Sequence, residues 1–275
     1  MVTSLIRSKQ FNRGRLLGRY WRIILDGTGL FYFKEKHCDN CLCTTRTMDD
    51  GKKIKMYYHK VLEAKIAFSD NVIVSLGTEF IENESENVSK QDCEKNAAKR
   101  LLKKIKKDYP RLPVCIQGDA LYATEPIMKL CRVKTEAMNV FEYKYEKEDK
   151  EKKKQEIRFQ WVSSLEVTKR NLEEMILAGR GRWKIENEGF NNQKNGLYQI
   201  EHLNSKNSNA MKNHYLLTQI SDILMQLYLA WNPYIKELKQ TIKNTSSGLL
   251  ESFRRLTVTE EDVSYIYRYT TVYIE

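Results

Sequence analysis

The 275-residue sequence has no long hydrophobic run, and this absence excludes several classes of protein. No apolar stretch approaches the ~18 residues of a membrane-spanning helix. Residues 1–15 include basic side chains but no apolar core of a signal peptide. We therefore expect a cytoplasmic protein with no membrane partner. In that compartment its six cysteines are thiols or metal ligands rather than disulfides.

Acidic residues do not balance the basic ones. The chain has 47 Lys and Arg against 36 Asp and Glu, which gives a formal net charge of +11. Such a surplus favours a polyanionic partner, either nucleic acid or an acidic membrane surface. The alternative is a protein whose basic charge has no specific partner.

The first half of the chain predicts an α/β fold with a mixed sheet. Three strands are expected before a helix whose N-terminal signal is Ser89 with Asp92 and which Pro110 ends, and a fourth strand follows that helix. The predicted strands are 21–25, 54–68, 72–80 (after a turn at 69–71) and 113–118.

The second half begins with a highly charged segment, 142–158, which predicts the exposed tip of a β-hairpin. Its lysines 152–154 are either a DNA-facing cluster or a solubilising loop. Helical periodicity resumes at Leu172 and continues through Ile185, and a long amphipathic helix is expected over 210–230. Beyond residue 244 the helix and strand signals are mixed, and no element is assigned.

Two aspartates stand where predicted strands end, at Asp26 and Asp119. Polar groups just past the carboxyl ends of strands line ligand crevices in α/β sheets, although Asp is also common at such positions without any function. Further along, Arg182 and Glu186 are four residues apart and share a face of an α-helix. A surface ion pair would explain that spacing equally well. Glu188 is the rival of Glu186, but two residues apart on a helix the two carboxylates point in different directions.

The segments that carry these residues resemble the acidic motifs of DDE transposases of bacterial insertion sequences. The last segment is similar to the YREK pattern, Y-x2-R-x3-E-x6-K: Arg182 and Glu186 match, Gly179 stands at the tyrosine, and Lys194 comes one residue late. The quoted segments are LDGTG (25–29), SLGTEFIEN (75–83), QDCEKNAAKRL (91–101), GDALYA (118–123) and RWKIENEGFNNQKN (182–195).

The resemblance implies an RNase H-like catalytic core that cuts and joins DNA strands with two Mg²⁺ or Mn²⁺ ions. Paired ions ~3.5–4 Å apart stabilise the attacking and leaving oxygens, and carboxylates are the ligands that such hard cations prefer. Asp26 is then expected between the ions, Asp119 on one and Glu186 on the other, with Arg182 holding a phosphate or orienting Glu186.

The same resemblance divides the chain into expected parts. The core is expected at 21–133 and 171–232, after an N-terminal segment 1–20, with a β-hairpin insertion at 134–170 and a C-terminal extension at 233–275. Lys194 and His202 are candidate DNA-binding residues, although a loop histidine can equally be structural. Trp161 and the tyrosines of 143–145 fit strand packing or base stacking.

A separate cluster predicts a zinc site. His37, Cys38, Cys41 and Cys43 fall within the seven residues HCDNCLC, and Cys-x2-Cys has structural-zinc spacing. The sequence has no second Cys-x2-Cys, so the ligands besides Cys38 and Cys41 must come from His37, Cys43 or His59. An ordinary thiol loop is the alternative.

The sequence therefore predicts a DDE-type transposase acting on duplex DNA, as a homodimer, in the bacterial nucleoid. A nuclease without strand transfer and a non-catalytic DNA-binding remnant are the alternatives. Only 25 residues precede Asp26, so a truncated or split reading frame is expected, or recognition of the transposon ends by another component.

Overall fold

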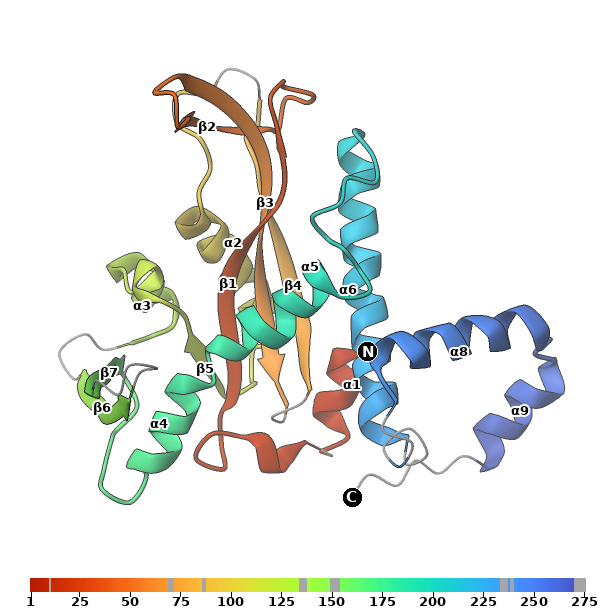
Figure 1. The fold of residues 1–275 in the computed structure, drawn as a ribbon. Helices are drawn as coiled ribbons and strands as arrows, with labels where there is room; N and C mark the ends of the chain where they lie inside the picture. Colours follow the sequence, from red (N-terminus) through yellow and green to blue (C-terminus); the bar gives the residue numbers. More distant parts are fainter. Residues whose placement is uncertain are drawn as a thin grey trace.

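The computed structural model describes residues 1–9, 11–68, 72–85, 88–133, 138–148, 154–232, 237 and 240–269. A mixed sheet has helices on both faces, with a two-stranded hairpin to one side and a helical C-terminal extension to the other (Figure 1). The predicted α/β class with a mixed sheet is therefore confirmed. No helix in these ranges is long and apolar enough to cross a membrane.

The elements are, in chain order, α1 (Val2–Arg7), the 3₁₀ helix η1 (Asn12–Gly14), β1 (Trp21–Phe33), β2 (Leu42–Thr47), β3 (Lys53–Ala67), β4 (Ile73–Ile81), α2 (Glu94–Asp108), β5 (Val114–Gln117), the 3₁₀ helix η2 (Ala120–Tyr122), α3 (Glu125–Leu130), β6 (Asn139–Glu148), β7 (Lys154–Ser163), α4 (Leu172–Arg180), the π-helix η3 (Ile185–Asn191), α5 (Asn192–Asn195), α6 (Ser208–Trp231), α8 (Ile242–Arg255) and α9 (Glu260–Tyr269).

The sheet is organised around β1 and β3. β1 runs antiparallel to β3 on one side and parallel to β5 on the other. The opposite edge of β3 pairs with β2 along residues 53–58 and with β4 along residues 60–67. Since β5 is parallel to β1, the carboxyl ends of these two strands point the same way.

β1 is longer than the sequence predicts, because it continues past Asp26 to Phe33. The predicted end at Asp26 is wrong, because Asp26 lies opposite Glu63 inside the β1–β3 ladder. The pairing shifts register between Gly29 and Phe31 and then continues with Phe31 opposite His59. The partner strand continues to supply hydrogen bonds, so Gly27 and Gly29 do not end the strand. Asp119, in contrast, does lie just beyond the end of β5.

Alternating residues of β1 build the two sides of the core. Ile23 and Leu25 pack with the buried face of α2, including Ala98 and Leu101. On the other face, Ile24 packs with residues of η3. The buried residues of α2 are Ala97, Ala98, Leu101, Leu102 and Ile105, and those packed with Ile24 are Ala67, Ile73, Ile185 and Phe190.

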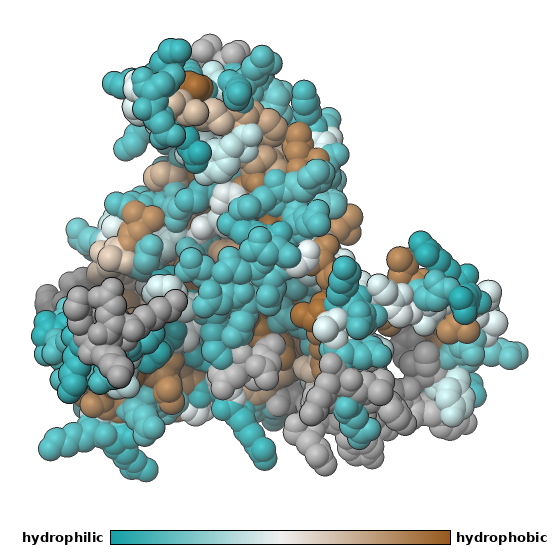
Figure 2. Space-filling view, viewed as in Figure 1, coloured by the Kyte–Doolittle hydropathy of each residue, from teal (hydrophilic) through white to brown (hydrophobic). Residues whose placement is uncertain are grey.

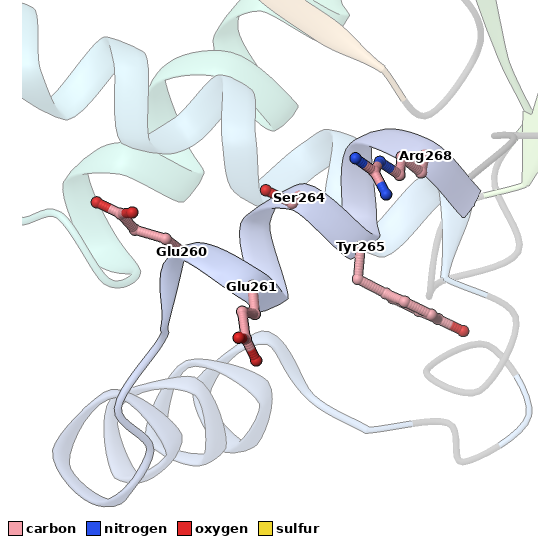
Figure 3. A pocket seen from close by; sticks show the side chains of 5 residues that line it. All are labelled: Glu260, Glu261, Ser264, Tyr265 and Arg268. Atoms are coloured by element: carbon pink, nitrogen blue, oxygen red, sulfur yellow. The ribbon is translucent and has the colours of Figure 1, made fainter.

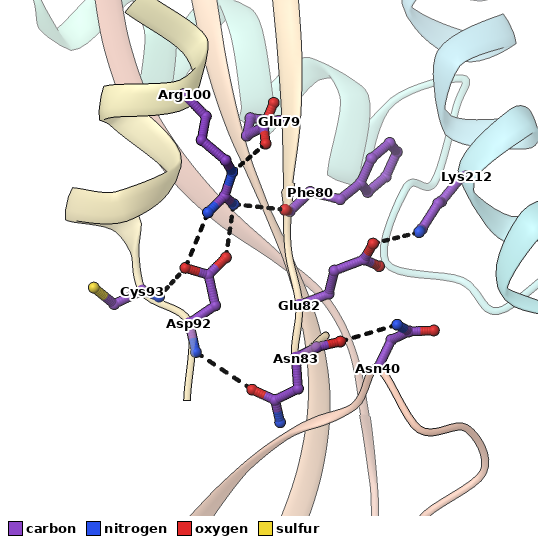
Figure 4. Close-up of polar contacts among 9 residues, drawn as sticks. All are labelled: Asn40, Glu79, Phe80, Glu82, Asn83, Asp92, Cys93, Arg100 and Lys212. Atoms are coloured by element: carbon purple, nitrogen blue, oxygen red, sulfur yellow. Dashed lines mark hydrogen bonds and ion pairs between the residues drawn. The ribbon is translucent and has the colours of Figure 1, made fainter. Parts of the chain in front are cut away.

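The helix predicted from Ser89 begins instead at Glu94. Asp92 is held outside the helix, because it accepts hydrogen bonds from Cys93 N at 2.9 Å and Arg100 Nη2 at 2.7 Å, while its own N–H donates to Asn83 Oδ1 (Figure 4). The acidic side chain therefore joins α2 to the end of β4 rather than forming part of the first helical turn.

The second half of the chain follows the predicted pattern with two differences. The hairpin β6–β7 and the long helix α6 are present. Lysines 152 and 153 lie outside the described residues, as does the turn predicted at 69–71 in the first half of the chain. Helical periodicity through Ile185 does not give one α-helix: α4 ends at Arg180 and the π-helix η3 starts at Ile185. The tail left unassigned after 244 contains helices α8 and α9.

Candidate functional site

Four predicted metal ligands meet at the connection between β1 and β2. His37, Cys38 and Cys41 lie in that connection and His59 lies in β3, and their ligand atoms are all within 4.8 Å of one another. Cys41 Sγ is 3.3 Å from Cys38 Sγ, 3.4 Å from His37 Nδ1 and 3.5 Å from His59 Nε2. The prediction that these four residues can hold a metal ion is confirmed.

The distances suit a tetrahedral ion. With Zn–S bonds of ~2.3 Å and Zn–N bonds of ~2.0–2.1 Å, tetrahedral ligand atoms lie about 3.3–3.8 Å apart. Burial raises the pKa of the Cys38 thiol to about 11, and the neighbouring Cys41 adds to the shift. Burial lowers the pKa of His59 to about 4. The imidazole is therefore neutral, as a metal ligand must be, and metal binding would release protons from the thiols.

Backbone contacts fix the ligand loop against the end of β4. Asn83 Nδ2 donates to the carbonyl oxygen of Cys41 at 2.9 Å. Asn40 Nδ2 donates to the carbonyl oxygen of Asn83 at 2.9 Å, as Figure 4 shows. Cys43, the alternative ligand, is the second residue of β2. Its backbone N–H donates to the side chain of Gln91, and its carbonyl oxygen accepts a hydrogen bond from the same side chain. Cys43 is not part of the group.

The two aspartates and the arginine form a second cluster. Asp26 Oδ2 lies 3.9 Å from Arg182 Nη1, and both side chains are largely buried. Burial raises the pKa of Asp26; the Gly27 N–H and the Arg182 charge oppose this shift, whereas the charges of Glu94 and Asp119 add to it. Asp119 therefore lies close enough to Asp26 for their charges to interact. Its Oδ1 accepts a hydrogen bond from Leu121 N at 2.9 Å.

Glu94 is a member of this cluster that the sequence interpretation missed. Its carboxylate accepts a hydrogen bond from Tyr122 Oη at 2.7 Å and forms an ion pair with Lys60. A Cβ placed on Gly27 would lie 2.7–2.9 Å from the carboxylate atoms. The segment that holds Glu94 had been singled out in the sequence, but only the packing of α2 against β1 shows where this side chain points.

Gly118 accommodates the same arrangement from the other side. A Cβ on Gly118 would lie 2.7 Å from Cδ2 of the Tyr122 ring. The glycine beside each aspartate thus leaves room for one member of the Glu94–Tyr122 pair. The segments that hold Asp26 and Asp119, which are far apart in the sequence, are therefore packed against each other through the Glu94–Tyr122 pair.

The third predicted carboxylate does not join the cluster in the described chain. The only group of three or more His, Cys, Asp or Glu ligand atoms found within 4.8 Å of one another in the described residues is the His/Cys cluster. Glu186 and Glu188 are both exposed, and the outer face of η3 is hydrophilic (Figure 2). Because η3 is a π-helix with i→i+5 bonding, the α-helical spacing that favoured Glu186 does not apply there.

The contacts of Lys194 and His202 in the described residues are with other parts of the chain than the aspartates. Lys194 Nζ forms an ion pair with Glu201 Oε1 at 2.8 Å. His202 is exposed, and its backbone N–H donates to the carbonyl oxygen of Gln199 in a turn. Gln193, which stands at the lysine position of the YREK pattern, is fully buried.

The structure has two cavities to consider, and only one of them borders these clusters. A groove of about 450 Å³ follows β5, and its lining includes Asp119, Tyr122 and Arg182 among apolar residues. Another, of about 390 Å³, lies on α9, where the labelled side chains do not converge on one point (Figure 3). It contains none of the predicted site residues.

In comparisons with known proteins, no family model, no curated protein and no solved structure matches the chain.

Proposed function

We propose that this protein is a DDE-type transposase that cleaves DNA strands and transfers the resulting 3′-OH to target DNA. The observation that carries the proposal is the position of Asp26 in β1 next to the parallel strand β5, just beyond whose end Asp119 lies, with Arg182 Nη1 3.9 Å from Asp26 Oδ2. Two carboxylates and a guanidinium are groups suited to cations and to a phosphodiester.

The fold supports an RNase H-like core. Leaving the β2 extension aside, the chain order of β1, β3, β4, α2 and β5 is the strand, strand, strand, helix, strand order that the transposase resemblance implies. Under this proposal the protein acts on duplex DNA as a homodimer in the bacterial nucleoid.

Under this proposal Asp26 and Asp119 would be oxygen ligands for Mg²⁺ or Mn²⁺, but in the described residues neither Glu94 nor the exposed Glu186 forms a group of three ligand atoms within 4.8 Å with them. A bound ion would supply Lewis-acid stabilisation of phosphate oxygens. Arg182, partly buried beside Asp26, would bind a non-bridging phosphate oxygen and hold the scissile phosphate at the sheet edge.

The proposal is tested with Asp119→Asn in a strand-nicking assay with Mg²⁺ or Mn²⁺. We expect nicking to fall by more than ~10²-fold, because the amide removes the ligand charge. Asp108→Asn, at the exposed end of α2, is the matched control and should nick normally. Wild-type nicking by Asp119→Asn would refute the proposed site. A donor–target joining assay separates a transposase from a nuclease.

A non-catalytic DNA-binding protein is the second candidate, and the exposed position of Glu186 outside the ligand group favours it. Wild-type protein that binds duplex DNA but never nicks it would support this candidate. If nicking occurs, Glu186→Gln and Glu188→Gln identify the glutamate that contributes.

We also infer that the His37–Cys38–Cys41–His59 group binds zinc and that its role is structural. Two thiolates and two imidazoles at tetrahedral spacing leave no open coordination position for a substrate. Elemental analysis of purified protein should give about one equivalent of zinc per chain. A content close to zero after purification with added zinc would exclude the site.

A further inference from the structure

The solvent face of α2 is rich in lysines, of which Lys99 is half-buried and the others are exposed; Asn96, Arg100 and Asp108 are exposed as well. Its core face packs on the sheet, whereas every side chain that points outward along the middle and end of the helix is polar. Among its charged residues, only Glu94 and Arg100 form ion pairs in the described chain. The lysines of this face are Lys95, Lys99, Lys103, Lys104, Lys106 and Lys107.

Four of these lysines form a stripe. Lys95, Lys99, Lys103 and Lys107 are each four residues apart, so they follow one another along neighbouring turns of the same face. At 1.5 Å per residue, the stripe is about 18 Å long. One strand of duplex DNA carries a phosphate about every 3.4 Å of helix axis, so each lysine can reach a separate phosphate.

A merely solvated face explains this arrangement poorly. Like charges four apart on a helix repel one another and lower helix stability. The charged hairpin β6–β7 shows how the same chain arranges a solvated surface: Lys144 Nζ lies 2.8 Å from Glu142 Oε1, and Lys154 Nζ lies 3.3 Å from Glu146 Oε2. The lysines of α2 form no ion pair in the described chain, so their charges are available to bind a polyanion.

The stripe also starts beside the candidate site. Glu94, the first residue of α2, interacts electrostatically with Asp26 and is hydrogen-bonded to Tyr122. Lys95 is the next residue along the chain. A duplex whose scissile phosphate lay near Asp26 and Asp119 could therefore continue along α2.

We propose that the lysine stripe of α2 is a DNA-binding surface that holds the phosphate backbone of the duplex flanking the candidate site. The inference rests on the proposed function, because that function makes duplex DNA the polyanion. Lysines acting as point charges read no sequence, so the contact should be independent of base sequence and sensitive to salt.

The test compares two variants with the same change in net charge. The stripe variant replaces Lys95, Lys99, Lys103 and Lys107 by Gln, which has nearly the same helix propensity as Lys. The control variant replaces by Gln four exposed lysines that lie in other parts of the chain and form no ion pair in the described residues. The control lysines are Lys9, Lys53, Lys147 and Lys243.

Binding of each protein to duplex DNA of arbitrary sequence is measured from ~50 to ~200 mM salt, the range over which phosphate contacts dominate the salt dependence. Each lost phosphate contact should lower the magnitude of the slope of log K against log salt by about 0.9, so the stripe variant should lose roughly 3–4. The control variant should keep a slope close to that of the wild type. Unchanged thermal melting of both variants shows that they fold.

Three outcomes would overturn the inference: an unchanged slope in the stripe variant, an equal loss in both variants, or a wild-type protein that binds phosphatidylserine vesicles but not DNA. No catalysis is measured, so the proposed function fails separately. A chain that never nicks DNA but shows the expected difference in slope would refute the transposase and keep the DNA-binding surface.

Discussion

At the scale of single residues, the glycines beside the two aspartates determine how the candidate site is built. Gly27 leaves room for the carboxylate of Glu94, and Gly118 leaves room for the ring of Tyr122. The hydrogen bond from Tyr122 Oη to Glu94 joins these two neighbours between the motifs. The positions of Asp26 and Asp119 relative to each other therefore depend on the Glu94–Tyr122 pair.

Gly27→Ala should lower the free energy of unfolding by about 1–3 kcal/mol, because the new methyl group overlaps the Glu94 carboxylate. Urea denaturation measures the loss. Gly29→Ala is the matched control in the same strand: its Cβ would lie no closer than 3.3 Å to its nearest neighbour, the Tyr32 hydroxyl, and it should cost less.

The double variant Gly27→Ala/Glu94→Ala isolates the steric cause. If Glu94 is the obstacle, alanine at 27 should cost much less in the Glu94→Ala background than in the wild type. An equal cost in both backgrounds would contradict the packing described for this pair.

What could be predicted for individual residues depends on whether the signal is local. His37, Cys38 and Cys41 lie within five residues, so their spacing alone indicates a metal site, and His59 follows from the adjacent strand. Glu94 could not be predicted, since its role depends on the direction in which α2 meets β1. The choice of Glu186 over Glu188 rests on its four-residue spacing from Arg182 and on the match to the family pattern, and the π-helix does not follow the α-helical geometry that this spacing assumes.

At the scale of elements, the strands except β2 and the helices α2, α4 and α6 follow from hydrophobic periodicity, whereas the other helices and several element ends do not. β1 extends to Phe33 because β3 provides a partner along that length, a long-range condition that the sequence of β1 does not contain. α2 begins at Glu94 rather than Ser89 because Asp92 is engaged by Arg100. Helix ends are decided by such tertiary hydrogen bonds.

The β1–β2 connection has no regular secondary structure from Lys34 to Cys41, so its order should depend on the metal. Removing zinc with a chelator, or replacing Cys38 by Ser, should lower the melting temperature by several degrees and increase hydrogen exchange in residues 34–41. Cys43→Ser is the matched control, because Cys43 is outside the ligand group. If chelator and Cys38→Ser leave both melting and exchange unchanged, the metal does not order this connection.

At the scale of the whole molecule, a buried polar network joins the sheet to α5 and α6. Lys65 of β3 is fully buried, and its amine donates to Gln219 Oε1 at 3.1 Å. Gln193 of α5 donates to Asp222 Oδ2 at 2.8 Å and is also bonded to Gln219. The network thus ties the helices that follow the third motif to the centre of the sheet.

Lys65 is the only cation among the charged residues of this network in the described chain, and it faces two carboxylates. Burial raises the pKa of Glu63 and of Asp222, and the Lys65 charge lowers both pKa values. Glu63 also accepts a hydrogen bond from Ser75 Oγ at 2.6 Å. Replacing the lysine should therefore leave two buried carboxylates without a counter-charge.

Lys65→Met should lower the free energy of unfolding by about 3–5 kcal/mol at neutral pH. Without the lysine, the folded-state pKa values of Glu63 and Asp222 rise further above their unfolded values. A carboxyl group with a raised pKa contributes stability that is complete below its unfolded pKa and is lost as pH rises through its folded pKa. The deficit of the variant should accordingly shrink as pH falls from 7 towards ~4.

Urea denaturation of wild type and variant across that pH range measures the deficit. Lys53→Met, an exposed lysine at the start of the same strand, is the matched control and should change stability little at any pH. A deficit of Lys65→Met that stayed constant with pH would indicate lost packing rather than lost charge. In that case the packing of the Lys65 side chain, rather than its charge, stabilises the contact of the sheet with α5 and α6. The amine would then not stabilise the ionised forms of Glu63 and Asp222.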